Sequence, residues 1–131
     1  MLRVFCLCSL GGLLFPLAGC GPRGPRVYDV SGTATFDGKP IENGDIIFLA
    51  ADGQVSPDAG KIVDGKFQVR VKEGSKKVEI RATKEIGRTS MGALYDDYIP
   101  SKYNGQTTLT AQIPTTDGSN HLEFDLKSDS D

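Results

Sequence analysis

Residues 60–71, Gly-Lys-Ile-Val-Asp-Gly-Lys-Phe-Gln-Val-Arg-Val, decide the fold class of this 131-residue chain. Apolar and polar side chains alternate on both sides of Asp64-Gly65, which is the period-two pattern of strands with one buried face. An Asp-Gly dipeptide suits the positive φ angles of a type I′ turn, which joins two strands with a matching twist. The stretch therefore predicts a β-hairpin.

The same alternation extends in both directions from this hairpin, and no part of residues 27–127 shows an apolar stripe with the helical period. Turn residues recur at short intervals, as they do in sandwiches and barrels. We therefore expect one all-β domain over residues 27–127, a seven-stranded antiparallel sandwich, followed by an acidic tail at 128–131. The strands are expected at residues 27–36, 46–50, 60–63, 67–71, 77–83, 108–113 and 121–126.

The N-terminal segment has the layout of an export signal. One basic residue, Arg3, precedes an apolar stretch, and Leu17-Ala18-Gly19 stands directly before Cys20. The apolar stretch is shorter than the roughly 20 residues of a membrane-spanning helix, and glycine and proline interrupt it. We expect residues 1–19 to be a signal peptide; a permanent transmembrane anchor and an ordinary secretory signal are the alternatives.

Residues 17–20, Leu-Ala-Gly-Cys, resemble the lipobox of bacterial lipoproteins. The resemblance implies that Cys20 carries a diacylglyceryl group and becomes the acylated, palmitate-bearing N-terminus after cleavage. Several acyl chains hold a domain on a membrane without a spanning helix. Residues 20–26 would then be a lipid-attached tether, and Gly21 in place of an aspartate favours the outer membrane of the cell envelope.

Cysteine content and charge narrow the function further. Cys6 and Cys8 would leave with the signal peptide and Cys20 would carry the lipid, so the exported domain would have no free thiol. The formal net charge of the chain is −2, whereas a nucleic-acid binder normally shows a basic stripe. We therefore expect no disulfide, no cysteine chemistry and no nucleic-acid partner.

Residues 30–44 read Val-Ser-Gly-Thr-Ala-Thr-Phe-Asp-Gly-Lys-Pro-Ile-Glu-Asn-Gly. They are followed by an expected strand, a Gly-Lys-Ile hairpin and the run Gly-Ser-Lys-Lys-Val-Glu-Ile at 74–80. This pattern resembles the carboxypeptidase regulatory-like and transthyretin-like domains, including small bacterial lipoproteins with a segment like Tyr-Ile-Pro-Ser-Lys-Tyr-Asn at 98–104. The resemblance implies a prealbumin-like or immunoglobulin-like Greek-key sandwich that serves as an accessory, structural or binding module. Enzymes of the transthyretin-like group use several histidines and a C-terminal Tyr-Arg-Gly-Ser motif, which this chain lacks.

Residues that could carry chemistry are sparse. The single histidine, His121, is predicted to lie on the solvent face of its strand, and no serine stands in a Gly-x-Ser-x-Gly motif. Asp96-Asp97, Asp125, Asp129 and Asp131 could in principle hold calcium, but they lack the spacing of a calcium loop. We expect no enzymatic activity, no cofactor and no metal.

The connection at residues 91–106 is the candidate binding loop. It holds Tyr95, Tyr98, Lys102 and Tyr103, and long connections in compact domains are often functional. Tyrosine has a flat apolar ring and a polar tip, so this loop could contact a protein or a glycan; alternatively it only covers the core as a lid. The leading hypothesis is a lipid-anchored envelope module that binds a protein, and carbohydrate binding is the alternative.

Overall fold

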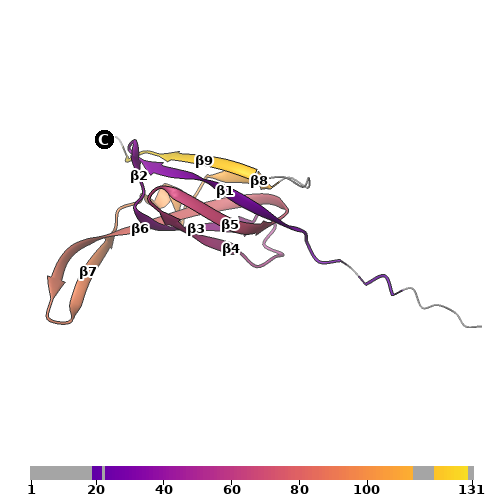
Figure 1. Cartoon of the computed structure of the whole chain (residues 1–131), viewed down its shortest axis with the longest axis horizontal. Helices are drawn as coiled ribbons and strands as arrows, with labels where there is room; N and C mark the ends of the chain where they lie inside the picture. The colour runs from indigo at the N-terminus through magenta and orange to yellow at the C-terminus, as the bar shows by residue number, and fades with distance from the viewer. Residues whose placement is uncertain (1–18, 22, 114–119, 130–131) are drawn as a thin grey trace, which may run out of the picture.

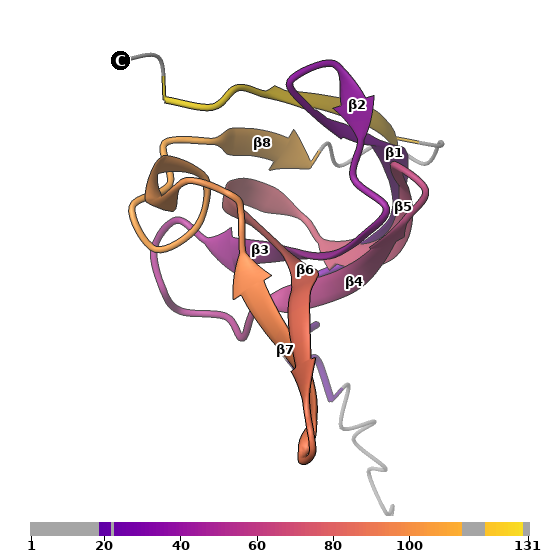
Figure 2. The same cartoon turned by 90° about the vertical axis from the view of Figure 1, so that its left-hand side faces the viewer.

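The computed structural model describes residues 19–21, 23–113 and 120–129. It consists of strands β1 (Val27–Phe36), β2 (Lys39–Pro40), β3 (Asn43–Ala50), β4 (Asp58–Val63), β5 (Lys66–Lys72), β6 (Gly74–Thr89), β7 (Gly92–Asp97), β8 (Thr110–Ile113) and β9 (Asn120–Leu126), and of one short 3-10 turn, η1 (Ser101–Tyr103). The prediction of an all-β, sandwich-like fold is confirmed. The strands form a sheet that curls like half a barrel (Figures 1 and 2).

The predicted hairpin at residues 60–71 is present. Asp64 and Gly65 have φ angles of 50° and 74°, and Ile62 pairs with Phe67 on either side of them. Asp37 and Gly38 have nearly the same pair of angles, 49° and 79°, and turn β1 into the short strand β2. Both Asp-Gly dipeptides thus form two-residue turns of the type that positive φ permits.

Strand order follows the path β2-β1-β5-β4-β3-β6-β7, with β8 paired to β6 and β9 paired to β1. The structure corrects the predicted count of seven strands to nine among the described residues. It also corrects the all-antiparallel arrangement, because β9 runs parallel to β1, with Val30 opposite Asn120 and Phe36 opposite Leu126. Side-chain alternation identifies the buried face of a strand but not its neighbour, so the sequence could not reveal this pairing.

The core lies inside the curled sheet. Inward residues of β1, β3, β5, β6 and β9 are buried. The ring of Phe67 on β5 lies between those of Phe48 on β3 and Phe124 on β9, with centroid distances of 6.5 Å and 6.1 Å. Lys76 is also buried, on the inward face of β6. The alternation of this strand predicts an apolar residue at that position. The buried apolar residues are Tyr28, Val30, Ala34, Ile41, Ile46, Phe48, Ile62, Phe67, Val69, Val71, Val78, Ile80, Ala82, Ile99, Ile113, Phe124 and Leu126.

Two terminal segments leave this body. Residues 19–21 and 23–26 are exposed and belong to no strand, and within the described residues no helix has the length and apolar character needed to cross a membrane. The predicted signal peptide, apart from Gly19, lies outside the described residues. At the other terminus, Ser128 donates its backbone N–H to Asp37 (2.9 Å), so the first part of the acidic tail is attached to the β1–β2 turn.

Candidate functional site

A two-stranded arm projects from the body of the domain. Strand β6 loses its pairing with β3 after Ala82 and continues as one strand of a hairpin with β7, in which Thr83 lies opposite Asp97 and Thr89 opposite Gly92. We call residues 83–97 the arm; Figure 2 shows it extending away from the curled sheet. The predicted loop at 91–106 is therefore corrected over residues 92–97, which form a strand.

The residues at the tip of the arm explain why the sequence did not reveal it. The turn at Ser90 and Met91 lacks the Asn-Gly or Asp-Gly dipeptide that marks a short hairpin. It is held instead by the hydroxyl of Thr89, which accepts a hydrogen bond from Met91 N (3.2 Å) and donates one to the carbonyl of Gly92 (3.3 Å). A bulge between Glu85 and Gly87 also breaks the alternation of β6.

Exposed apolar side chains concentrate on this arm. Met91 is 97% exposed, Tyr95 63%, Ile86 59% and Leu94 47%. These are four of the six large apolar residues of the described chain that are exposed. Single apolar residues on a surface are common, but a group of them on one projecting element is typical of an interaction surface.

Tyr98 stands at the base of the arm and packs on the core. Its ring lies edge-on to Phe36, with 5.6 Å between ring centroids, and the Lys84 ammonium lies 5.9 Å from its centroid. Burial raises the pKa of the Tyr98 hydroxyl, and the carboxylates of Glu42 and Asp97 raise it further. The hydroxyl is therefore neutral at physiological pH and available as a hydrogen-bond donor.

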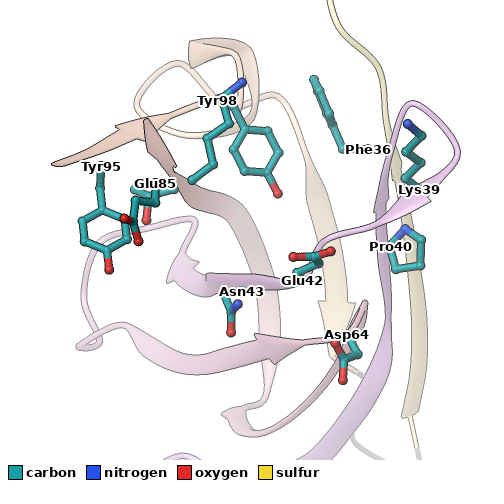
Figure 3. Close-up of a pocket in the computed structure, with 11 residues that line it drawn as sticks. Phe36, Lys39, Pro40, Glu42, Asn43, Asp64, Glu85, Tyr95 and Tyr98 are labelled. Atoms are coloured by element: carbon teal, nitrogen blue, oxygen red, sulfur yellow. The ribbon is translucent and has the colours of Figure 1, made fainter. Parts of the chain in front are cut away.

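An aromatic cleft of about 990 Å³ opens between the arm and the β1–β2 hairpin. Figure 3 shows Tyr98 pointing toward Glu42 across the cleft, with Tyr95 on the arm side and Phe36 and Pro40 on the opposite side. Apolar rings and a rim of both charge signs are thus combined in one hollow, as is common in binding sites. The lining residues are Phe36, Lys39, Pro40, Glu42, Asn43, Asp64, Thr83, Lys84, Glu85, Tyr95 and Tyr98.

The four candidate residues of the predicted loop divide into two pairs. Tyr95 and Tyr98 line the aromatic cleft. The hydroxyl of Tyr103, by contrast, accepts a hydrogen bond from Lys127 N (3.0 Å), and Lys102 lies over the Tyr103 ring and pairs with Asp129 at 2.7 Å. The hydrogen bond that the Lys102 ammonium donates to the Asp129 carboxylate is the main cause of the raised pKa of Lys102. This second pair contacts the C-terminal segment and does not line the aromatic cleft.

Nine of the eleven residues that line the aromatic cleft lie outside the predicted loop at 91–106, and six of them come from a distant part of the chain, residues 36–64. Phe36, Pro40 and Glu42 belong to the β1–β2 region, and the contact of the Phe36 ring with Tyr98 brings this region to the base of the arm. The sequence offered one sign of this part of the cleft: Phe36 and Pro40 stand on either side of a turn, and apolar residues beside an exposed turn suggest a contact surface.

The histidine and the acidic residues take other places. His121 is exposed on β9, as predicted, with Nε2 3.5 Å from Glu123. Asp125 accepts a hydrogen bond from the Thr35 hydroxyl (2.8 Å), which together with the nearby Lys127 ammonium lowers the pKa of this carboxyl group. Among residues 19–21, 23–113 and 120–129, no three His, Cys, Asp or Glu side chains lie close enough to share a metal ion.

Comparison with known protein-family models, with curated proteins and with solved structures finds no match to this chain. The resemblance to carboxypeptidase regulatory-like and transthyretin-like domains therefore stays a prediction.

Proposed function

We propose that this chain is a lipid-anchored, non-enzymatic module of a bacterial cell envelope that binds another protein through the arm and the aromatic cleft. The observation that carries the proposal is the group of exposed apolar residues on the arm, Ile86, Met91, Leu94 and Tyr95, beside a cleft lined by further aromatic rings. Aromatic residues and methionine are enriched in the centres of protein interfaces.

The position of the arm supports this proposal. Figure 1 shows the N-terminal segment leaving one end of the long axis and the arm projecting at the other. Cys20 is exposed, and a tether over residues 20–26 would reach about 25 Å when extended. A lipid on Cys20 would then hold the domain near a membrane, with the arm at the far end of the molecule from the anchor.

The lining of the aromatic cleft also supports the proposal. It contains rings, a proline and side chains of both charges. The mixed charges suit a polypeptide, which presents apolar and charged side chains together. The proposed relationship to carboxypeptidase regulatory-like and transthyretin-like domains agrees with a non-enzymatic role.

Carbohydrate binding is the second candidate. Tyr95 is 63% exposed, and the Tyr98 hydroxyl points across the cleft toward Glu42 (Figure 3). A flat ring with hydrogen-bonding groups beside it is also suited to a sugar face. A glycan array with the parent chain separates the two candidates, because a glycan hit that Tyr98→Ala removes would favour the carbohydrate.

The decisive experiment compares protein partners captured by the parent chain and by arm variants. Tyr95→Ser and Leu94→Ser should each reduce capture of a partner from envelope extracts at least about tenfold, as expected when a central apolar contact is lost. Val63→Ser is the matched control, since Val63 is 56% exposed but lies on β4 and belongs neither to the arm nor to the lining of the aromatic cleft. Equal recovery of every partner by all four chains would contradict the proposal.

The lipid anchor has its own test. Mass spectrometry of the purified N-terminus should find an acylated residue at position 20, and Cys20→Ser should release the chain from the membrane fraction. An unmodified Cys20 would contradict the anchor while leaving protein binding by the arm intact.

A further inference from the structure

We propose that the arm pairs with the arm of a second copy of this chain, β7 against β7 in antiparallel orientation, with Tyr95 opposite Tyr95 of the second copy. This inference rests on the proposed protein-binding role of the arm and names one partner for it. The pairing would join the two hairpins into a four-stranded ribbon with a two-fold axis at Tyr95.

The outer edge of β7 is open. In the described part of the chain, β7 pairs only with β6. Just beyond β7, Tyr98 donates its N–H to the carbonyl of Ala82 (3.2 Å), so the backbone groups of Tyr98 face β6. Backbone direction alternates along a strand, and the N–H and C=O groups of Asp97 and Tyr95 therefore face outward. An unpaired edge of this kind is a template for a further strand.

Two-fold symmetry limits the possible registers. In an antiparallel pair of identical strands around a two-fold axis, one residue must lie opposite its own copy. Because the outward groups of β7 include those of Tyr95, a pair centred on Tyr95 lets the two copies exchange both backbone hydrogen bonds. It also brings together the two rings that are 63% exposed in a single copy, and cross-strand aromatic pairs stabilise a sheet.

Charge favours the same register. The base of β7 carries Asp96 and Asp97, so a pair centred on either acid would place like charges opposite each other. Centring on Tyr95 places Asp96 opposite Leu94 and Asp97 opposite Ala93 of the second copy. No acid then faces an acid, and like charges in direct opposition are the arrangement that destabilises a strand pair.

An arginine completes this charge pattern. Arg88 lies opposite Ala93 within the arm, so Arg88, Ala93 and Asp97 of the second copy would stand in one row across the ribbon. Strands are spaced about 4.8 Å apart, which places the two charged residues about 10 Å apart at their Cα atoms. Extended arginine and aspartate side chains span that distance over the small Ala93. In a single copy Arg88 pairs with Glu85 at the surface, where its side chain is 73% exposed.

The first test is a disulfide across the two-fold axis, made in the full chain under mild oxidation. Opposite residues in such a pair have Cα atoms about 5.5 Å apart, within disulfide range. Tyr95→Cys should therefore give a covalent dimer, identified by mass spectrometry as a peptide linked to its own copy at position 95. Val63→Cys, of similar exposure, and Leu94→Cys should form such a link at least about tenfold more slowly, because Leu94 lies opposite a different residue.

The second test exchanges the charges. Arg88→Glu and Asp97→Arg should each weaken self-association of the detergent-solubilised full chain roughly tenfold. A one-to-one mixture of the two variants should restore it, because each new charge then meets an opposite charge on the other copy. Loss of arm structure in either variant would not be repaired by mixing, so restoration supports the pairing specifically.

The outcomes are separable from those of the proposed function. A link at position 95 no faster than at position 63, together with a parent chain that stays monomeric at about 0.1 mM, a concentration that detects weak interfaces, would overturn the inference. If capture of a different protein still depended on Tyr95 and Leu94, the proposed function would stand without self-pairing. A fast link at position 95 with charge rescue would establish the second copy as the occupant of this edge.

Discussion

Among the described glycines, Gly32 leaves the least room for a side chain, and this supports a quantitative prediction. A Cβ atom at this position would lie 1.9 Å from the Leu122 carbonyl oxygen of β9 and 2.6 Å from Cζ of Phe67. Since carbon contacts are optimal at about 3.5–4.0 Å, Gly32→Ala requires the backbones of β1 and β9 to separate by about 1 Å or more. Small-to-large changes in a packed core destabilise by about 1–3 kcal/mol, and a clash with backbone lies at the upper end.

The substitution should therefore lower the free energy of unfolding by about 2–3 kcal/mol, after about 0.4–1 kcal/mol is regained from the stiffer unfolded chain. For a domain of this size, that corresponds to a fall in Tm of about 10–20 °C in thermal unfolding followed by circular dichroism. Gly87→Ala is the matched control, because a Cβ at Gly87 meets nothing within 4 Å. An unchanged Tm for Gly32→Ala would refute the parallel packing of β9 on β1.

Three further predictions concern the charged and tyrosine side chains. Asp58→Ala should lower the free energy of unfolding by about 2 kcal/mol in urea denaturation, because it leaves the half-buried Lys72 without its 2.5 Å partner. Asp45→Ala is the control: it breaks an equally short but exposed pair with Lys61 and should change the free energy of unfolding by less than about 1 kcal/mol. Hydrogen bonds lower the pKa values of Asp37 and Asp125 below 3.8, so their stabilisation is present above that pH and is lost as pH falls through the folded values; alanine at both positions should flatten the acid limb of a pH–stability curve. The raised pKa of Tyr98 makes the folded state favour the neutral hydroxyl, so stability should fall as pH rises above about 10, and Tyr98→Phe should remove that part of the fall.

Alternation along the chain was enough to predict the strands that line the core. Each of these strands has one apolar face, as in β5, where Phe67, Val69 and Val71 are buried and Gln68 and Arg70 are exposed. The Asp64-Gly65 turn was predictable for a similar local reason, since its dipeptide fits the required φ angles. Local chemistry specified these elements without any knowledge of distant contacts.

The pairing of distant strands and the arm could not be predicted in the same way. The parallel contact of β9 with β1 depends on which surface remains open after β1 has paired with β5, and no local pattern encodes that. Tyr98 and Phe36 meet although 62 positions separate them in the chain. In the arm, most positions are exposed on both faces, so the apolar alternation that marks core strands has no reason to exist there.

The body of the domain stabilises the arm, and the exposed apolar residues of the arm do not contribute to the core. An isolated two-stranded hairpin is marginally stable in water, yet the arm is well formed because its first strand continues β6, whose preceding residues, 74–82, pair with β3 or β8. The core gains nothing from Met91 or Leu94, which remain exposed. A third and fourth strand would give the arm the additional pairing that free hairpins lack. The proposed partner would supply that pairing and would cover the exposed apolar ribbon of this half-barrel sheet.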